Sequence, residues 1–132
     1  MGRMVKIGTI SRILHLQPIP RREYVELCEN MLEQAGKAGC DLVLLPEHFD
    51  SFGAAELEGT QQNLYLEGTD YSQMRHRIAE PIPGPLTKSL GALAARYRMY
   101  VVANYTELDG SKMYNTAVVI DRQGQVAGKY RK

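Results

Sequence analysis

The feature that most restricts the fold is a short run at residues 41–45, DLVLL, in which four apolar residues follow one another without alternation. Such a run is typical of a strand buried on both faces, as in a parallel sheet covered by helices. Before it, residues 21–38 carry apolar side chains at three- and four-residue steps, which predicts an amphipathic helix that Gly39 is well placed to end. Residues 4–10 contain Val, Ile and Thr and predict a strand. Strand, helix and strand in this order predict a right-handed crossover unit.

The alternation of helix and strand continues in the second half of the chain. A Gly-Pro pair at residues 84–85 marks the start of a second amphipathic helix, and residues 100–105 predict a third strand. Residues 113–121 and 125–130 predict two further strands, joined as a hairpin with Gly124 in the left-handed region of the turn. The end of the chain is therefore expected to be antiparallel.

Between these halves, residues 47–83 are polar, contain glycine and show weak periodicity, although residues 54–66 are compatible with a helix. We find no internal repeat and no interdomain linker, and a length of 132 residues suits one compact domain. The sequence thus predicts an α/β fold with a mixed sheet flanked by helices.

Charge and hydropathy exclude several classes of partner. Sixteen basic and fifteen acidic residues leave a formal net charge of +1, with both signs mixed along the chain, so we expect no binding to nucleic acid or to an acidic membrane surface. The longest apolar runs are too short to span a bilayer, and residues 1–3 lead directly into the first strand without the apolar core of a signal peptide. A cytoplasmic location is the default expectation.

Glu47 is the first candidate catalytic residue. It follows the apolar run and Pro46, at the carboxyl end of a strand, where open α/β sheets usually bind their ligands. A carboxylate there is expected to be partly desolvated, which disfavours its charged form and brings its pKa towards that of a general base at neutral pH. From the pattern alone, a surface glutamate after a strand is an equally good interpretation.

Lys132 is the second candidate. It closes a basic stretch at residues 128–132, GKYRK, and such stretches are more often solvated ends than sites. The combination with Glu47 at the end of another strand strengthens the case, because a base and an ammonium group together suit acyl-transfer chemistry.

The other reactive residue types form no recognisable site. Cys28 and Cys40 occupy helix-face and pre-strand positions typical of buried packing thiols, and neither is expected to be a nucleophile. The three histidines, His15, His48 and His76, lack metal-binding spacing, and we expect no metal site. The sequence contains neither GxGxxG after the first strand nor GxxxxGK[ST], so it predicts no cofactor and argues against an unrelated nucleotide-binding α/β domain.

Four ordered segments together resemble the nitrilase, or carbon-nitrogen hydrolase, superfamily. The segments are residues 39–47 (GCDLVLLPE), 79–85 (AEPIPGP), 114–117 (YNTA, followed by Ile120, Asp121 and Gly124) and 128–132 (GKYRK). They are spread over residues 39–132, and an ordered set is far more specific than a lone Leu-Pro-Glu tripeptide.

The resemblance implies a four-layer α-β-β-α sandwich and hydrolysis of a non-peptide carbon–nitrogen bond in an amide, an N-carbamoyl compound or a nitrile. Glu47 would be the general base and Lys132 the group that stabilises the tetrahedral intermediate. The family's nucleophilic cysteine would lie beyond Lys132, as would its second glutamate. The resemblance also implies a homodimer or higher homo-oligomer.

Residues 1–132 are accordingly expected to be the amino-terminal portion of one hydrolase domain, truncated after the catalytic lysine and inactive alone. Cutting a sandwich at Lys132 should also leave sheet edges and apolar faces uncovered, so we expect this chain to self-associate. An alternative interpretation is a non-catalytic relative that acts as a binding or interaction module, which resemblance of fold alone does not exclude.

Overall fold

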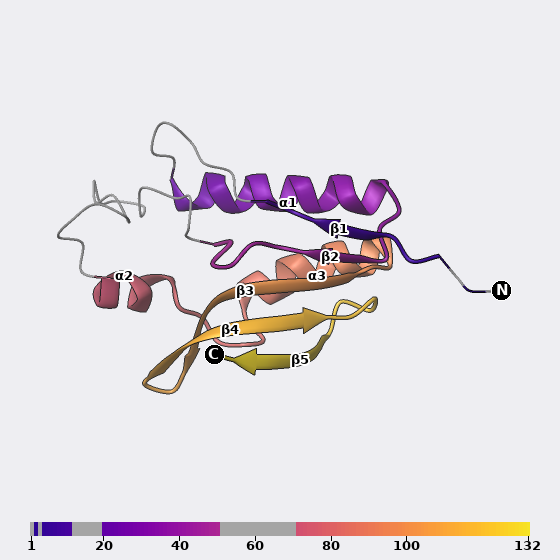
Figure 1. The fold of residues 1–132 in the computed structure, drawn as a ribbon. Helices are drawn as coiled ribbons and strands as arrows, with labels where there is room; N and C mark the ends of the chain where they lie inside the picture. Colours follow the sequence, from indigo (N-terminus) through magenta and orange to yellow (C-terminus); the bar gives the residue numbers. More distant parts are fainter. Residues whose placement is uncertain (1, 3, 12–19, 51–70) are drawn as a thin grey trace.

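The structure is a computed structural model that describes residues 2, 4–11, 20–50 and 71–132 (Figure 1). In the described residues the elements are, in chain order, β1 (Ile7–Thr9), α1 (Arg21–Lys37), β2 (Leu42–Leu44), α2 (Tyr71–Ile78), α3 (Pro85–Tyr97), β3 (Tyr100–Asp109), β4 (Lys112–Ile120) and β5 (Val126–Arg131). None of the helices in this part of the chain is long and apolar enough to cross a membrane.

The strands form one mixed sheet in the order β1-β2-β3-β4-β5. β1, β2 and β3 are parallel, whereas β4 pairs antiparallel with both β3 and β5. The parallel pairs are joined through helices, and the antiparallel pairs through short turns, as the geometry of each pairing requires. The predicted α/β class with a mixed sheet is therefore confirmed.

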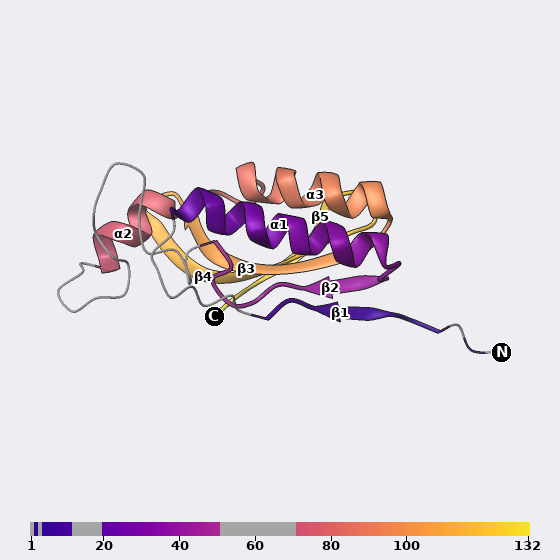
Figure 2. The same ribbon diagram turned by 90° about the horizontal axis from the view of Figure 1, so that it is seen from above.

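Helices α1 and α3 cover one face of the sheet (Figure 2). The strand side chains beneath them are fully buried, namely Val43, Val101, Ala103, Tyr105, Val118 and Ile120. From α1, one stripe at helical spacing joins this core, consisting of Tyr24, Cys28, Leu32 and Gly36. Burial of each large apolar side chain contributes about 1.5 to 3 kcal/mol, so this interface between helices and sheet holds the fold together.

The opposite face of the sheet carries partly exposed apolar side chains. The register places Ile7, Leu44, Tyr100 and Tyr130 on this face, and their exposed fractions range from 36% for Leu44 to 72% for Tyr130. Apolar side chains in such an arrangement are typical of a sheet that packs against a second sheet. One helical layer on one sheet makes up the α-β half of the expected α-β-β-α sandwich.

The turn between β4 and β5 lies against α3 through two glycines. Gly124 has φ +80°, as the sequence predicts, and a Cβ atom added there would lie 2.5 Å from the carbonyl oxygen of Gly91. A Cβ atom added to Gly91 would meet the carbonyl oxygen of Gly124 at the same distance. The absence of side chains at both positions therefore sets how closely the hairpin approaches the helix.

The structure corrects several predicted boundaries. The first strand is only Ile7–Thr9, because its pairing with β2 covers three residues. β3 continues to Asp109, since its antiparallel pairing with β4 extends beyond the apolar segment at 100–105. Helix α2 was not predicted, and the helix considered at 54–66 lies outside the described residues.

Candidate active site

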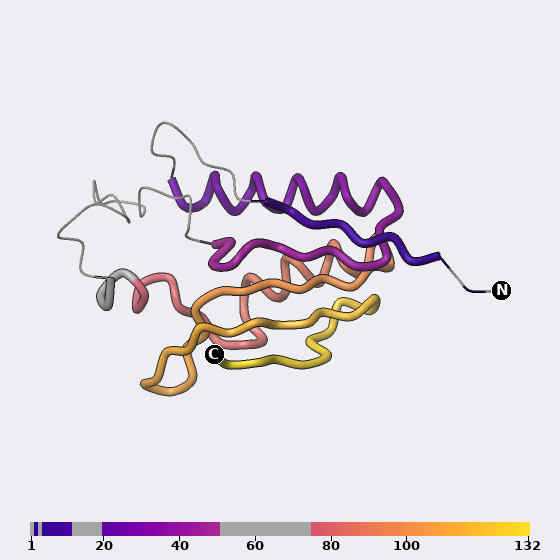
Figure 3. The backbone as a smooth tube through the Cα atoms, viewed as in Figure 1, coloured from indigo at the N-terminus to yellow at the C-terminus, as the bar shows by residue number. Residues whose placement is uncertain are grey.

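Glu47 and Lys132 both lie at the carboxyl ends of strands that run in the same direction. Glu47 comes three residues after the end of β2, and Lys132 follows β5 directly. β5 is antiparallel to β4, and β4 to β3, so β5 runs in the direction of β3 and β2. Lys132, at the chain end marked C in Figure 3, therefore lies at the same end of the sheet as the carboxyl end of β2.

The two candidate residues contact each other although 85 positions separate them in the sequence. The ammonium Nζ of Lys132 donates a hydrogen bond to Oε1 of Glu47 at 3.2 Å. The backbone N–H of Lys132 donates to the carbonyl oxygen of Asn115 at 2.9 Å, which continues the β4–β5 ladder to this residue. The structure therefore brings together the two site residues that the sequence selects.

Two asparagine side chains connect the Glu47 carboxylate to the central strands. Asn115 on β4 donates from Nδ2 to Oε1 of Glu47 at 2.9 Å. Asn104 on β3 donates from Nδ2 to Oδ1 of Asn115 at 2.6 Å and accepts the backbone N–H of His48 at 2.9 Å. The amides thus form a chain of hydrogen bonds that starts and ends on the loop after β2, and this loop is fixed to the central strands.

The expected desolvation of Glu47 is wrong for this chain. Its side chain is 48% exposed, and the hydrogen bond from Asn115, followed by the hydrogen bond and charge of Lys132, holds the pKa of its carboxyl below the ordinary range. Donors to the ionised form outweigh burial here. Glu47 is consequently a carboxylate at neutral pH.

Neither cysteine of the sequence belongs to this site. Cys28 is fully buried in the α1–sheet interface, where its Sγ donates to the carbonyl oxygen of Phe49 at 3.7 Å. Burial raises the pKa of its thiol to about 11. Cys40 is partly buried and packs against the core. Cys28 is therefore the packing thiol that the helical pattern predicts.

The described residues contain no cluster of three or more His, Cys, Asp or Glu side chains that could hold a metal ion. Glu47 has an ammonium group and an amide beside it, and neither group is a metal ligand in this arrangement. The geometry instead presents a carboxylate and a cation side by side, an arrangement that suits acyl-transfer chemistry.

Over residues 16–132 the sequence matches the carbon-nitrogen hydrolase family. The chain belongs to this family. A bifunctional nitrilase/nitrile hydratase of Lupinus angustifolius is 31% identical over 115 residues, which cover 82% of this chain and 31% of that protein. This carbon-nitrogen hydrolase chain thus spans about a third of the length of that plant relative.

The fold is similar to two solved structures. A carbon-nitrogen hydrolase from Helicobacter pylori G27 superposes with a TM-score of 0.69 and 22% identity, over 98% of this chain and 40% of that one. A variant of an amidase from Nesterenkonia sp. AN1, with acrylamide added at its active-site cysteine, superposes with a TM-score of 0.66 and 17% identity, over 98% of this chain and 44% of that one. These likenesses establish the carbon-nitrogen hydrolase fold.

Sequence reasoning did not identify the two asparagines of the site. Asn115 lies in the YNTA segment at 114–117, which supported the family resemblance but gave no residue a role. Asn104 is a polar residue within a strand that is otherwise mainly apolar, and this is the signal that could have selected it. Their link to Glu47 depends on the register of β3 and β4, which the sequence does not specify.

Proposed function

We propose that this carbon-nitrogen hydrolase cleaves a non-peptide carbon–nitrogen bond in an amide, an N-carbamoyl compound or a nitrile. Glu47 acts as the general base, and Lys132 is the cation beside the reacting carbon. The observation that carries the proposal is the 3.2 Å contact between these two side chains, which come from strand ends far apart in the sequence. Family membership supplies the reaction class.

The protonation state of Glu47 suits the role of a base. It is ionised at neutral pH, as a carboxyl with the ordinary pKa is, so it can accept a proton, although its lowered pKa makes it a weaker base than a desolvated carboxylate. Asn115 bonds to the carboxylate through a side chain that is itself held by Asn104, so the orientation of the carboxylate is set before a substrate binds. A base that is already oriented does not have to be ordered during the reaction.

Lys132 suits the stabilisation of negative charge. Its ammonium group has three N–H donors, and the bond to Glu47 uses one of them. The other donors are available to an oxygen or nitrogen that becomes negative when a tetrahedral intermediate forms. The side chain is 71% exposed, so it is accessible to a small substrate.

The nucleophile in this proposal is a cysteine that follows Lys132, with residues 1–132 forming the amino-terminal portion of the hydrolase domain. Glu47 accepts the thiol proton, and the sulfur bonds to the carbonyl or nitrile carbon. In an amide, the carbon–nitrogen bond breaks and the leaving amine takes the proton from Glu47. Water then hydrolyses the thioester. In a nitrile, the nitrogen takes the proton from Glu47 to give a thioimidate, which water hydrolyses with release of ammonia. The active-site cysteine of the Nesterenkonia amidase supports this sequence of steps by analogy.

A second candidate function is a non-catalytic binding module. The observation that favours it is that both cysteines of this sequence lie in or against the helix–sheet core, and Cys28 has a raised pKa. Such a protein would bind a small amide or nitrile without turnover. The homo-oligomer implied by the family resemblance stays a prediction in either case.

The test is ammonia release from a panel of amides, carbamoyl amino acids and nitriles, using the protein encoded by the whole reading frame that contains residues 1–132. We expect turnover with at least one class of substrate. Glu47→Gln should lower kcat by a factor on the order of 100 or more, because removal of a general base typically has an effect of this size.

Glu26→Gln is the matched control for this substitution. The Glu26 side chain is 53% exposed and pairs with Arg22 at 3.0 Å, much as Glu47 is exposed and pairs with Lys132, but it lies on α1. We expect this variant to keep the wild-type rate. Equal rates for both variants, or no turnover with the whole panel, would contradict the enzymatic proposal and favour the binding module.

A further inference from the structure

The side chain of Lys132 is held by few contacts of its own. Its side chain is 71% exposed and, among the described residues, forms an ion pair with Glu47, while its backbone N–H donates to Asn115. An exposed lysine has several rotatable bonds and is not positioned by packing. The position of its ammonium group therefore depends on the strand that carries it.

The strand β5 is the last in the sheet order of the described residues, and it pairs there only with β4. A strand with one neighbour opens most easily at its end. Lys132 follows that end directly. Side-chain contacts that hold the end of β5 therefore bear directly on the position of Lys132.

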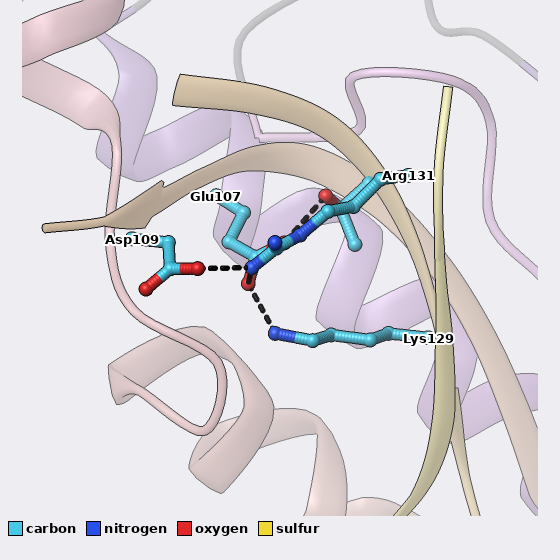
Figure 4. A network of polar contacts seen from close by, with 5 residues as sticks. Glu107, Asp109, Lys129 and Arg131 are labelled. Carbon is cyan, nitrogen blue, oxygen red and sulfur yellow. Dashed lines mark hydrogen bonds and ion pairs between the residues drawn. The ribbon is translucent and has the colours of Figure 1, made fainter. Parts of the chain in front are cut away.

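Arg131, the residue before Lys132, provides a firm attachment. Its guanidinium donates from Nε to Oε2 of Glu107 at 2.9 Å and from Nη2 to Oε1 of Glu107 at 2.7 Å (Figure 4). Nη2 also donates to Oδ2 of Asp109 at 2.6 Å, and the guanidinium lies over the ring of Tyr114 at 4.1 Å from its centroid. A bidentate arginine–carboxylate pair fixes orientation as well as distance.

Glu107 is buried to an unusual degree for a charged residue. It is 1% exposed, and its carboxylate also accepts hydrogen bonds from Thr116 Oγ1 at 2.7 Å and from the ammonium group of Lys129. A buried carboxylate is tolerated only when its oxygens are satisfied, and here both oxygens have donors. Glu107 is thus a fixed point within the sheet to which the end of β5 is tied.

The geometry of a strand connects this attachment to the site. Successive side chains point to opposite faces of a sheet, so Arg131 and Lys132 point in opposite directions. Arg131 lies opposite Thr116, which is fully buried on the helix-covered face, whereas Lys132 reaches Glu47. Because the guanidinium of Arg131 is fixed on one face of the sheet, the side chain of Lys132 extends from the opposite face.

We propose that Glu107 is a positioning residue that acts through Arg131 to hold the ammonium group of Lys132 against Glu47. This inference rests on the proposed function of Glu47 and Lys132 as the working pair. Glu107 does not contact the substrate in this proposal. Its effect on the site passes through the backbone of β5.

The test measures the pKa of the Glu47 carboxyl by carbon-13 NMR titration, which needs no turnover. Lys132→Met sets the reference, because it removes the ammonium group and should raise the pKa of Glu47. We expect Glu107→Gln and Arg131→Lys to raise it by at least half as much. Asp109→Asn is the matched control, because it removes an exposed carboxylate from the same guanidinium and should leave the titration near that of the wild type.

A wild-type titration of Glu47 in folded Glu107→Gln and Arg131→Lys would overturn the proposal. If Glu107→Gln fails to fold, Arg131→Lys decides, since it keeps both charges and loses the bidentate geometry. Loss of the fold in both variants would also overturn it, because Glu107 would then support the core as a whole. Absence of turnover in the wild-type protein would contradict the proposed function and leave the titration result unaffected.

Discussion

Asn115 and Lys132 donate to the same oxygen of Glu47, and Asn115 is the nearer of the two, with Nδ2 at 2.9 Å from Oε1. The hydrogen bond from Asn115 is the largest single cause of the lowered pKa of the carboxyl, followed by the hydrogen bond and the charge of Lys132. A neutral amide and a cation therefore stabilise the ionised form of the candidate base together.

We expect Asn115→Ala to raise the pKa of Glu47 towards the ordinary value, because the ionised form loses its closest donor. The same carbon-13 titration measures this change. Asn30→Ala removes an exposed asparagine from α1 and should leave the pKa unchanged. A Glu47 carboxyl that titrates identically in all three proteins would show that the amide does not stabilise the carboxylate.

Glu107 should make stability depend on acid pH. The hydrogen bonds from Arg131 lower the pKa of its carboxyl to about 2 from an ordinary 4.5. A group whose pKa is lower in the folded state contributes stability that is fully present above the unfolded value and is lost as pH falls through the folded value. The contribution is therefore expected to be full above about pH 5 and to disappear between about pH 4.5 and pH 2.

Urea unfolding of wild-type protein and Glu107→Gln at several pH values measures this contribution. Above pH 5 the variant should be less stable by roughly 2 to 3 kcal/mol, which is less than the roughly 3 to 5 kcal/mol of a fully buried pair, because the basic partners of Glu107 are about one-third exposed. The difference should shrink as the pH falls towards 2. A difference that is constant with pH would mean that the ionised carboxylate is not what stabilises the fold.

Much of the architecture follows from periodicity in the sequence. Helices α1 and α3 are predicted because apolar side chains recur at helical spacing, β2 because its apolar run is uninterrupted, and the β4–β5 hairpin because Gly124 lies between two strand-like segments. Helix α2, Tyr71–Ile78, was missed because the segment is mostly polar and has basic residues in its last turn. Its apolar pattern is too weak to mark a helix.

The site could be predicted only in part, for a related reason. Glu47 and Lys132 were located through motif segments that can be read from the sequence. Glu107 appears in the sequence as one charge near the end of a strand, and nothing local indicates that it is buried. Its role follows from the pairing of β3 with β4 and of β4 with β5, which places Arg131 beside it. Long-range register of this kind is set by tertiary packing.

The contact between the hairpin turn and α3 predicts an unequal effect of alanine at two glycines. Gly124 and Gly110 both have positive φ, so alanine costs about 1 to 2 kcal/mol of backbone strain at either position. A Cβ atom at Gly124 also meets the carbonyl oxygen of Gly91, whereas one at Gly110 meets no atom within 4 Å. We expect Gly124→Ala to destabilise the chain by a further 1 to 3 kcal/mol or so, as overpacking does. Equal midpoints of thermal unfolding for Gly124→Ala and Gly110→Ala would contradict the close approach of Gly124 to Gly91.

Cys28 should be inert towards thiol reagents in the folded chain. It is 1% exposed and has a pKa of about 11, so almost no reactive thiolate is present at neutral pH. Iodoacetamide labelling at pH 7.5, followed by mass spectrometry of peptides, should show Cys40 modified first, because Cys40 is only partly buried. In urea the two rates should become similar. Preferential labelling of native Cys28 would disagree with its burial and would reopen its assignment as a packing thiol.

The exposed apolar face of the sheet predicts self-association of the 132-residue chain. Ile7 is 59% exposed, Tyr100 37% and Tyr130 72%, and the register places all three on the face opposite the helices. Exposed apolar patches on one face drive contacts between molecules. Sedimentation velocity should therefore show species larger than the monomer, and Tyr130→Lys should shift the distribution towards the monomer.

Lys112→Tyr is the control, because it adds an exposed aromatic ring away from the centre of the sheet face opposite the helices. Lys112 lies beside the β3–β4 turn. This variant should not change the distribution in the way that Tyr130→Lys does. If self-association comes from the uncovered face, it should also decrease when residues that supply the second sheet of the sandwich are present on the same chain. A sharp monomer peak with cooperative unfolding for residues 1–132 would show instead that this half of the sandwich is stable without cover.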